Sequence, residues 1–246
     1  MQNKYVGDVG DFGKYGMLRF LVSTCNNLKI GVNWYLVDDE DTTDGKHTSY
    51  LNKNKDLCNC DLELYYYLKS LIEQKKRNIM HIENDDIIPG CIYFSDLLKY
   101  ETNKITENQI MRELWFSRSL DKLQTANVIY VDPDNGLEVK SQNIHSSKGI
   151  KYVSYKEIYQ YYKNGKSIIV YNHRDRKPED IYKQRFTRIK NDLQLENDLI
   201  ILRFVRYSVR DYIFILQKEH YHEINRFVNL LMSSHWSSHF KLIGNE

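Results

Sequence analysis

The chain has 246 residues, with 35 lysines and arginines against 33 aspartates and glutamates and a formal net charge of +2. A chain of this length can bury a full core as one α/β domain, and the near balance of charge gives no global basic field of the kind that attracts nucleic acid. The mean hydropathy is −0.61 and no long apolar run occurs, which excludes a membrane span. Residues 1–5 lack the apolar core of a signal peptide, so we expect a cytoplasmic protein without a membrane partner.

The first segment of the chain carries glycines at positions 7, 10, 13 and 16. Glycine is costly in a helix. This spacing, together with Lys14, therefore favours an anion-binding turn at a helix N-terminus, where free N–H groups and the helix dipole attract phosphate or carboxylate. The segment is not a Walker A loop, because Tyr15 follows the lysine in place of serine or threonine. In the alternative interpretation, Asp8 or Asp11 only caps the helix, whose apolar part covers residues 17–22.

An apolar, β-rich run over residues 32–37 predicts the first strand. Acidic residues follow it directly, starting with Asp38 and Asp39, and a polar loop that includes Asp44 and His47 continues to about residue 54. We therefore expect this strand to deliver carboxylates at its carboxyl end.

Residues 54–125 are expected to form a helical and irregular insertion. Asp61 caps a helix over residues 62–76, and a short strand covers residues 91–94. A capping-box pattern at residues 106–109 begins a helix that ends near residue 123. Before the first of these helices, the Cys-Asn-Cys sequence at 58–60 has too little spacing for a zinc knuckle.

The most informative motif follows the apolar run at residues 128–131. That run is too short and too uniformly apolar for a surface helix, so it predicts a buried strand of a parallel sheet. It stops at Asp132-Pro133, and Asp134 with an Asn-Gly turn comes next. Proline cannot donate to a strand ladder, so the strand ends there, at the edge where open α/β sheets bind ligands. The alternative is a capped strand end with solvated acids.

A third apolar run, residues 167–171, ends in a polar cluster of its own. Because the carboxyl ends of parallel strands share one edge of a sheet, the three clusters predict a single polar cleft. Like charges at short range resist ionisation, so at least one carboxylate in the cleft should have a raised pKa. The side chains expected to line this cleft are Asp38 or Asp39, Asp132, Asp134 and His173.

The end of the chain changes in character. Ser154 begins a capped helix to about residue 164, and a charged helix covers about 178–195. An antiparallel hairpin (199–204 and 211–216) and a last helix (219–232) follow, after which Trp236 and Phe240 are expected to anchor in the core. We therefore predict one α/β domain over residues 1–246, Rossmann-like, with a mostly parallel sheet and a C-terminal antiparallel hairpin.

The sequence Gly-Asp-Phe-Gly-Lys at 10–14, the polar loop after the first strand and Asp132-Pro133 resemble the single-domain adenine-N6 methyltransferases that act on large-subunit ribosomal RNA. The chain also resembles a widespread bacterial family with a Gly-Asp-Phe-Gly-Lys-Tyr-Gly opening and an Asp-Pro-Asp-Asn-Gly motif. The first resemblance implies a class I methyltransferase fold, S-adenosylmethionine as cofactor and a nucleic-acid substrate. In that scheme Asp132 orients the target amine and Lys14 meets the cofactor carboxylate. The implied cofactor-binding residues are Gly10, Asp11, Lys14, Asp38, Asp39, Asp44 and His47.

Two departures from the methyltransferase pattern motivate a rival mechanism. The loop after the first strand has one glycine, Gly45, and Asp134 and Asn135 stand where the motif has its second proline and its aromatic residue. The added carboxylates favour a cation, so Asp39, Asp132 and Asp134 could hold Mg²⁺ or Mn²⁺ in a nuclease or phosphohydrolase.

His173 would then serve as general base or as proton donor to the leaving group. The basic residues expected to contact nucleic-acid phosphates are Lys148, Lys151, Arg174 and Arg176. Each of these interpretations has a simpler alternative. The aspartates could form a solvated turn, His173 could be a structural hydrogen-bond donor, and Arg174 and Arg176 could belong to a solvated helix start. The leading expectation is a nucleic-acid-modifying enzyme of the methyltransferase type. The metal-dependent nuclease comes second and a catalytically inactive binding module third.

Overall fold

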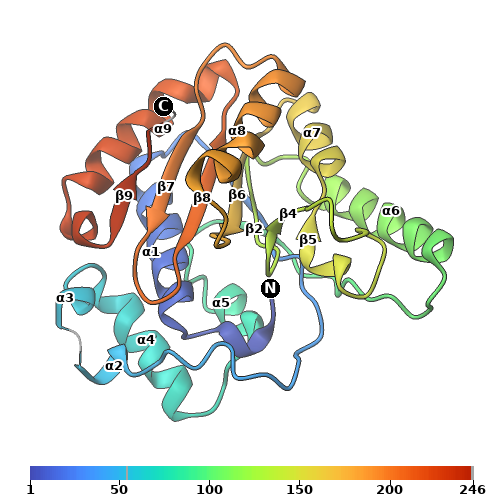
Figure 1. The fold of residues 1–246 in the computed structure, drawn as a ribbon. Coiled ribbons are helices and arrows are strands. Elements are labelled where there is room, and N and C mark those ends of the chain that lie inside the picture. Colours follow the sequence, from blue (N-terminus) through green and yellow to red (C-terminus); the bar gives the residue numbers. More distant parts are fainter. Residues whose placement is uncertain (54, 245–246) are drawn as a thin grey trace.

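The computed structural model describes residues 1–53 and 55–244 (Figure 1). Within these residues seven strands form a central sheet in the order β2-β1-β3-β6-β8-β7-β9, and β4 and β5 pair separately. The strands are β1 (Ile30–Asn33), β2 (Ile92–Phe94), β3 (Val128–Val131), β4 (Gly136–Leu137), β5 (Tyr152–Val153), β6 (Ser167–His173), β7 (Ile200–Phe204), β8 (Arg210–Ile215) and β9 (Phe240–Leu242).

Helices flank this sheet and fill the connections. The α-helices are α1 (Val9–Thr24), α2 (Tyr50–Lys53), α3 (Lys55–Cys58), α4 (Leu62–Glu73), α5 (Ile79–Asn84), α6 (Ile105–Lys122), α7 (Tyr155–Lys163), α8 (Glu179–Leu193) and α9 (Lys218–Met232). The 3-10 turns are η1 (Asn3–Tyr5), η2 (Gly149–Lys151) and η3 (His235–Ser238). Every helix in the described ranges is too short or too polar to cross a bilayer.

The three short apolar runs form the parallel centre of the sheet, as their sequences predict. β3 lies between β1 and β6 and is parallel to both, with Ile129 opposite Gly31 on one side and Ile168 on the other. All four residues of β3 are fully buried. A strand covered on both faces needs apolar side chains throughout, which is why these runs do not alternate.

The C-terminal strands complete a Rossmann-like sheet. β8 lies antiparallel between β6 and β7, which confirms the predicted hairpin and its insertion into the parallel sheet. β9, which the sequence analysis does not anticipate, adds a further antiparallel edge strand beside β7. Trp236 and Phe240 are 2% and 1% exposed, so the tail anchors in the core as expected.

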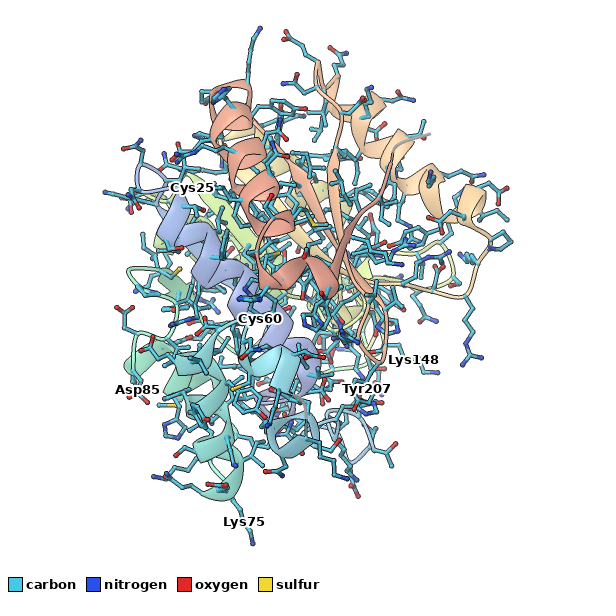
Figure 2. All side chains as sticks on the ribbon, turned by 90° about the vertical axis from the view of Figure 1, so that its left-hand side faces the viewer. Cys25, Cys60, Lys75, Asp85, Lys148 and Tyr207 are labelled. Carbon is cyan, nitrogen blue, oxygen red and sulfur yellow. The ribbon has the colours of Figure 1, made fainter. Side chains whose placement is uncertain are left out.

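Two hydrophobic cores cover the two faces of the sheet. Helices α1, α4 and α9 pack on one face and α6, α7 and α8 on the other (Figure 1). Because side chains alternate along a strand, Tyr130 of β3 points into the first core while Ile129 and Val131 point into the second. Figure 2 views the face covered by α1 and α9. Cys25 and Cys60 lie well apart on this face, and both are free thiols.

The first strand differs from its predicted span of 32–37. It begins at Ile30 and ends at Asn33, because the Asn33 side chain accepts a hydrogen bond from the Tyr35 N–H at 3.1 Å and Tyr35 takes a left-handed conformation with φ 46°. An asparagine that bonds the backbone two residues ahead favours a turn over an extended strand. Asp38 and Asp39 therefore follow a turn and several further residues instead of standing at the strand end.

The predicted helix starts have mixed outcomes. Ser154 and Glu157 form the predicted capping box, and Asp61 caps α4 by accepting from the Leu64 N–H. The prediction of a capping box at residues 106–109 is wrong. α6 begins at Ile105, and its N-cap, Lys104, makes no side-chain cap bond.

Candidate functional site

A cavity of about 590 Å³ opens at the carboxyl ends of β3 and β6, next to the start of α1. Ligand pockets in proteins span roughly 300–1,000 Å³, and in open α/β sheets they lie beyond the carboxyl ends of the strands. The lining residues are Met1, Tyr5, Asp8, Gly10, Asp11, Lys14, Thr43, Asp44, Gly45, His47, Asp132, Pro133, Asp134, Asn135, Tyr171, His173, Ser208 and Arg210.

The cavity brings together most of the residues that the sequence singles out. From the N-terminal segment it takes Gly10, Asp11 and Lys14, from the loop Asp44 and His47, and from the strand ends Asp132, Asp134 and His173. The two strand-end clusters of β3 and β6 thus meet as predicted. From the polar loop after the first strand, only its later residues, including Asp44 and His47, line the cavity.

Asp38 and Asp39 do not line the cavity, which corrects the expectation that one of them joins the cleft. Both are exposed. The Asp38 carboxylate pairs with Lys99 at 3.2 Å, and Asp39 Oδ1 accepts a hydrogen bond from the Lys4 N–H at 3.2 Å. Between β1 and these acids, the Tyr35 carbonyl and the Val37 N–H bond to Met1, and it is Met1 that lines the cavity.

The centre of the site is a buried chain of charges formed by Asp11, Lys14 and Asp132. Lys14 Nζ lies 2.8 Å from Asp11 Oδ1 and 2.6 Å from Asp132 Oδ2, and all three residues are at most 6% exposed. Each carboxylate also accepts from a phenol: Tyr15 OH donates to Asp11 at 2.9 Å, and Tyr130 OH donates to Asp132 at 3.2 Å.

Burial has opposite consequences for the two ends of the Asp11–Lys14 pair. Burial raises the pKa of Asp11 to about 6. Lys14 opposes this shift, and the like charge of Asp132 adds to it. Burial lowers the pKa of Lys14, but the carboxylates of Asp11 and Asp132 outweigh it and raise that pKa to about 12. The raised carboxylate pKa thus belongs to Asp11, which is not among the acids for which it is predicted, and its largest cause is burial and not the like charge of a neighbour.

The start of α1 is capped by the protein itself. Asp8 accepts hydrogen bonds from the Gly10 N–H and the His47 N–H, both at 2.9 Å, and the Val9 N–H donates to the His47 carbonyl at 3.0 Å. This is the capping interpretation, and it takes up donors that an anion-binding turn would need. Gly10 serves close packing instead, since a Cβ there would lie 2.1 Å from Nη1 of Arg210.

Asp134 faces the first residues of the chain. Its Oδ1 lies 2.7 Å from the Met1 α-amine, and its Oδ2 accepts from the Gln2 side-chain amide. The same α-amine donates to the carbonyl of Asp132 at 2.9 Å. These contacts fix the turn after β3 and hold the Asp134 carboxylate at the wall of the cavity.

His173 and Arg210 stand opposite each other at the ends of β6 and β8. Partial desolvation lowers the pKa of His173, and the Arg210 guanidinium adds to the effect, so the imidazole is neutral at pH 7. Arg210 is not among the residues predicted from the sequence, because it lies one residue before the predicted strand 211–216. A cation at the start of the strand that pairs with the His173 strand is the sequence feature that points to it.

The basic residues predicted to contact nucleic acid do not line the main cavity. Lys148 and Lys151 border a shallower recess of about 410 Å³ that shares Asn135 with it, and Lys151 pairs with Glu40. Arg174 pairs with Asp175 and Glu179, and its guanidinium carbon lies 4.1 Å from the Tyr182 ring centroid, so its charge is already paired within the protein. Arg176 is exposed.

No group of three or more histidine, cysteine, aspartate or glutamate side chains in the described part of the chain is placed to hold a metal ion. Asp39 lies outside the cavity, Asp132 is held by Lys14, and Asp134 faces the Met1 amine. The three acids of the metal hypothesis thus do not come together in this arrangement.

Comparison with known proteins gives no family. No family model matches the sequence, and no curated protein matches it. Among solved structures the chain is similar to a Legionella pneumophila protein of the family DUF519, with 12% sequence identity, 96% of each chain covered and a TM-score of 0.45. That level of similarity carries no argument about function, and the Rossmann-like assignment rests on the strand order described above.

Proposed function

We propose that the protein is a nucleic-acid-modifying enzyme that transfers a methyl group from S-adenosylmethionine to an amine. The observation that carries the proposal is the placement of the Asp132-Pro133-Asp134-Asn135 motif. It ends β3 at the edge of a Rossmann-like sheet and opens into the same cavity as the start of α1. Both segments carry the resemblance to adenine-N6 methyltransferases.

The charges of the cavity suit such a cofactor. S-adenosylmethionine supplies an electrophilic methyl group, and it carries a sulfonium, an ammonium and a carboxylate. The lining combines exposed and buried carboxylates, among them Asp44 and Asp134, with one guanidinium, Arg210. Asp44 and His47, on the loop after β1, would accept from and donate to the adenosine hydroxyls and amine.

Lys14 has a different role in this proposal from the one its position in the sequence implies. Its ammonium already holds two carboxylates, so it is not free to meet the cofactor carboxylate. Lys14 instead pairs with Asp132 and fixes the orientation of its carboxylate at the cavity wall. A fixed acceptor of this kind is what a target amine requires for alignment of its lone pair.

Methyl transfer to an amine would form an N–CH3 bond while the S–CH3 bond of the sulfonium breaks, with S-adenosylhomocysteine as the leaving group and one proton lost from nitrogen. Asp132 would accept a hydrogen bond from the amine, and neutral His173 would take the proton. Both residues line the cavity, and they lie at the ends of neighbouring parallel strands. In this proposal Asp132 at the end of β3 would orient the amine, and His173 at the end of β6 would accept its proton.

An aromatic platform at the rim supports a nucleobase as the substrate. Asn135 stands where the family motif has its stacking aromatic, but the exposed Tyr207 stacks on His47 with ring centroids 4.7 Å apart. His47 lines the cavity, and Lys148 borders the neighbouring recess. Stacking together with phosphate contacts is the usual basis of single-strand binding.

The direct test is calorimetric titration of the protein with S-adenosylmethionine, S-adenosylhomocysteine, Mg²⁺ and Mn²⁺ separately. The proposal expects saturable binding of both nucleosides in the absence of metal. Binding of Mg²⁺ or Mn²⁺ that is lost in Asp132→Ala, with no effect of either nucleoside, would replace it by the metal-dependent nuclease.

A further inference from the structure

We infer that Arg210 is the anion-binding group of the cavity and anchors a carboxylate or phosphate of the bound ligand. The inference concerns the same cavity as the proposed function but does not depend on methyl transfer. It names a binding subsite that the sequence motifs do not include.

Arg210 is a buried cation without an ion-pair partner among the described residues. It is 6% exposed, and no carboxylate of the described chain lies within 4.0 Å of its guanidinium. Its Nη2 donates to the hydroxyl of Ser208, and the Tyr171 hydroxyl also interacts with the guanidinium, whereas Nη1 is buried without a hydrogen-bond partner among the described residues. Buried charges are normally paired, because an unpaired one loses its hydration without compensation.

A second buried group without a hydrogen-bond partner interacts electrostatically with the Arg210 guanidinium. The Tyr212 hydroxyl, two residues along β8, is also buried without a hydrogen-bond partner. Burial raises the pKa of this phenol, and Arg210 opposes the shift, which shows that the two groups influence each other. Unsatisfied buried polar groups are rare in folded proteins, so the unpartnered Nη1 of Arg210 in the cavity lining indicates a missing partner.

The guanidinium is held in place before any ligand arrives. A Cβ on Gly10 would meet Nη1 at 2.1 Å and Cζ at 2.3 Å, so the helix backbone leaves just enough room for this group. On another side the ring of Phe204 lies 5.8 Å from Cζ. A fixed, planar fork of donors suits bidentate binding of a carboxylate or phosphate.

The other charged groups nearby are already engaged. Asp8 uses both oxygens on backbone N–H groups, and Asp11 is bound to Lys14 and Tyr15. His173 is neutral at pH 7 because its pKa is lowered. Arg210 is therefore the group in the cavity lining with charge and donor capacity left for an anion.

Two sources could supply that anion: the amino-acid carboxylate of an S-adenosyl ligand, or a phosphate of a nucleic-acid substrate. Four probes separate them. They are S-adenosylhomocysteine, 5′-methylthioadenosine (which lacks the amino-acid part), inorganic phosphate and a short single-stranded oligonucleotide. Each is titrated calorimetrically into the wild type, Arg210→Gln, Arg210→Lys and a control, Arg226→Gln. Arg226 is exposed on α9, outside the cavity lining, and its replacement makes the same change of charge.

We expect Arg210→Gln to weaken binding of the anionic probe by roughly 10- to 100-fold, the usual range for a lost hydrogen bond to a charged group. Arg210→Lys keeps the charge but loses the fork, so its loss should be smaller, and Arg226→Gln should match the wild type. Circular dichroism of each unliganded variant checks the fold. If Arg210→Gln does not fold, the lysine variant carries the test.

A loss for S-adenosylhomocysteine but not for 5′-methylthioadenosine assigns the subsite to the cofactor carboxylate. A loss for phosphate and the oligonucleotide assigns it to the substrate. Phosphate binding that depends on Arg210 in a protein that binds no S-adenosyl compound would support the subsite and reject the methyltransferase proposal. Equal binding of all anionic probes by the wild type and Arg210→Gln would overturn the inference, as would a wild type that binds none of them.

Discussion

Nζ of Lys14 lies 2.6 Å from Oδ2 of Asp132, although 118 positions separate the two residues in the chain. The contact joins the glycine-rich first helix to the Asp-Pro motif, the two segments that carry the family resemblance. Asp11 completes the arrangement from the same helix, one turn before the lysine. The Lys14 ammonium between these two buried carboxylates first of all stabilises the fold. It also fixes the orientation of Asp132 in the Asp-Pro motif.

Replacement of Lys14 by methionine should therefore destabilise the fold strongly. It leaves two buried carboxylates without their cation, and removal of one partner of a buried ion pair costs about 3–5 kcal/mol in the free energy of unfolding. Urea denaturation of the variant and the wild type at pH 7 measures the difference. Lys14→Met/Asp132→Leu, which removes both partners of the shorter contact, should recover part of the loss. A cost below about 1 kcal/mol would show that the contact is not a significant source of stability, since exposed pairs contribute that little.

Asp11 should titrate near pH 6. Burial raises its pKa to about 6 in the folded protein, whereas the ordinary value is 3.8. The native state thus holds this proton more tightly than the unfolded chain. The stabilising contribution is complete below about pH 4 and is lost as the pH rises through 6. Carbon-13 NMR of the carboxyl groups should show one aspartate with a midpoint near 6 that is absent in Asp11→Asn. A full set of aspartate midpoints near 4 would contradict this.

The sequence predicts the parallel strands because their burial requires apolar side chains along the whole run, a local property. Contacts between segments far apart in the chain cannot be predicted from such a local pattern. The pairing of Lys14 with Asp132 and the orientation of Arg210 against Gly10 depend on how α1 and β8 pack at the sheet edge. The end of β1 differs from its predicted position for another reason. Asn33 stops the strand by bonding its own backbone, although the residues after it have strong strand propensity.

The glycines of α1 give a prediction about packing. A Cβ on Gly16 would lie 2.2 Å from the ring of Trp236, so Gly16→Ala should force the helix and the C-terminal tail apart. Overpacking of this kind costs about 1–3 kcal/mol in the free energy of unfolding, which urea denaturation can measure. Gly244→Ala is the control, because nothing lies within 4 Å of a Cβ at that position. Equal stability of the two variants would mean that the contact relaxes without cost.

Tyr207 should contribute to nucleic-acid binding if its stack on His47 is a platform for bases. Tyr207→Ala is expected to weaken binding of a single-stranded oligonucleotide by about 1–3 kcal/mol, the usual value of one base-stacking aromatic. Tyr66→Ala is a matched control, since Tyr66 on α4 is 60% exposed and Tyr207 is 59% exposed. Fluorescence anisotropy of a labelled oligonucleotide gives both affinities. The platform is rejected if the two variants bind equally well.

In the proposed function, Asp132 orients a target amine beside a bound S-adenosyl cofactor. The most direct measurement is transfer of a tritiated methyl group from S-adenosylmethionine to RNA or DNA by the wild type and by Asp132→Asn, a variant that keeps the shape of the side chain and an acceptor for Lys14. We expect transfer by the wild type and a loss of roughly 100-fold or more in the variant, typical of a lost transition-state contact. The affinity of the variant for S-adenosylhomocysteine should remain within about twofold, because Asp132 acts on the amine and not on the cofactor. Transfer that is unchanged in Asp132→Asn, or a wild type that neither binds S-adenosylhomocysteine nor transfers the label, would contradict the account.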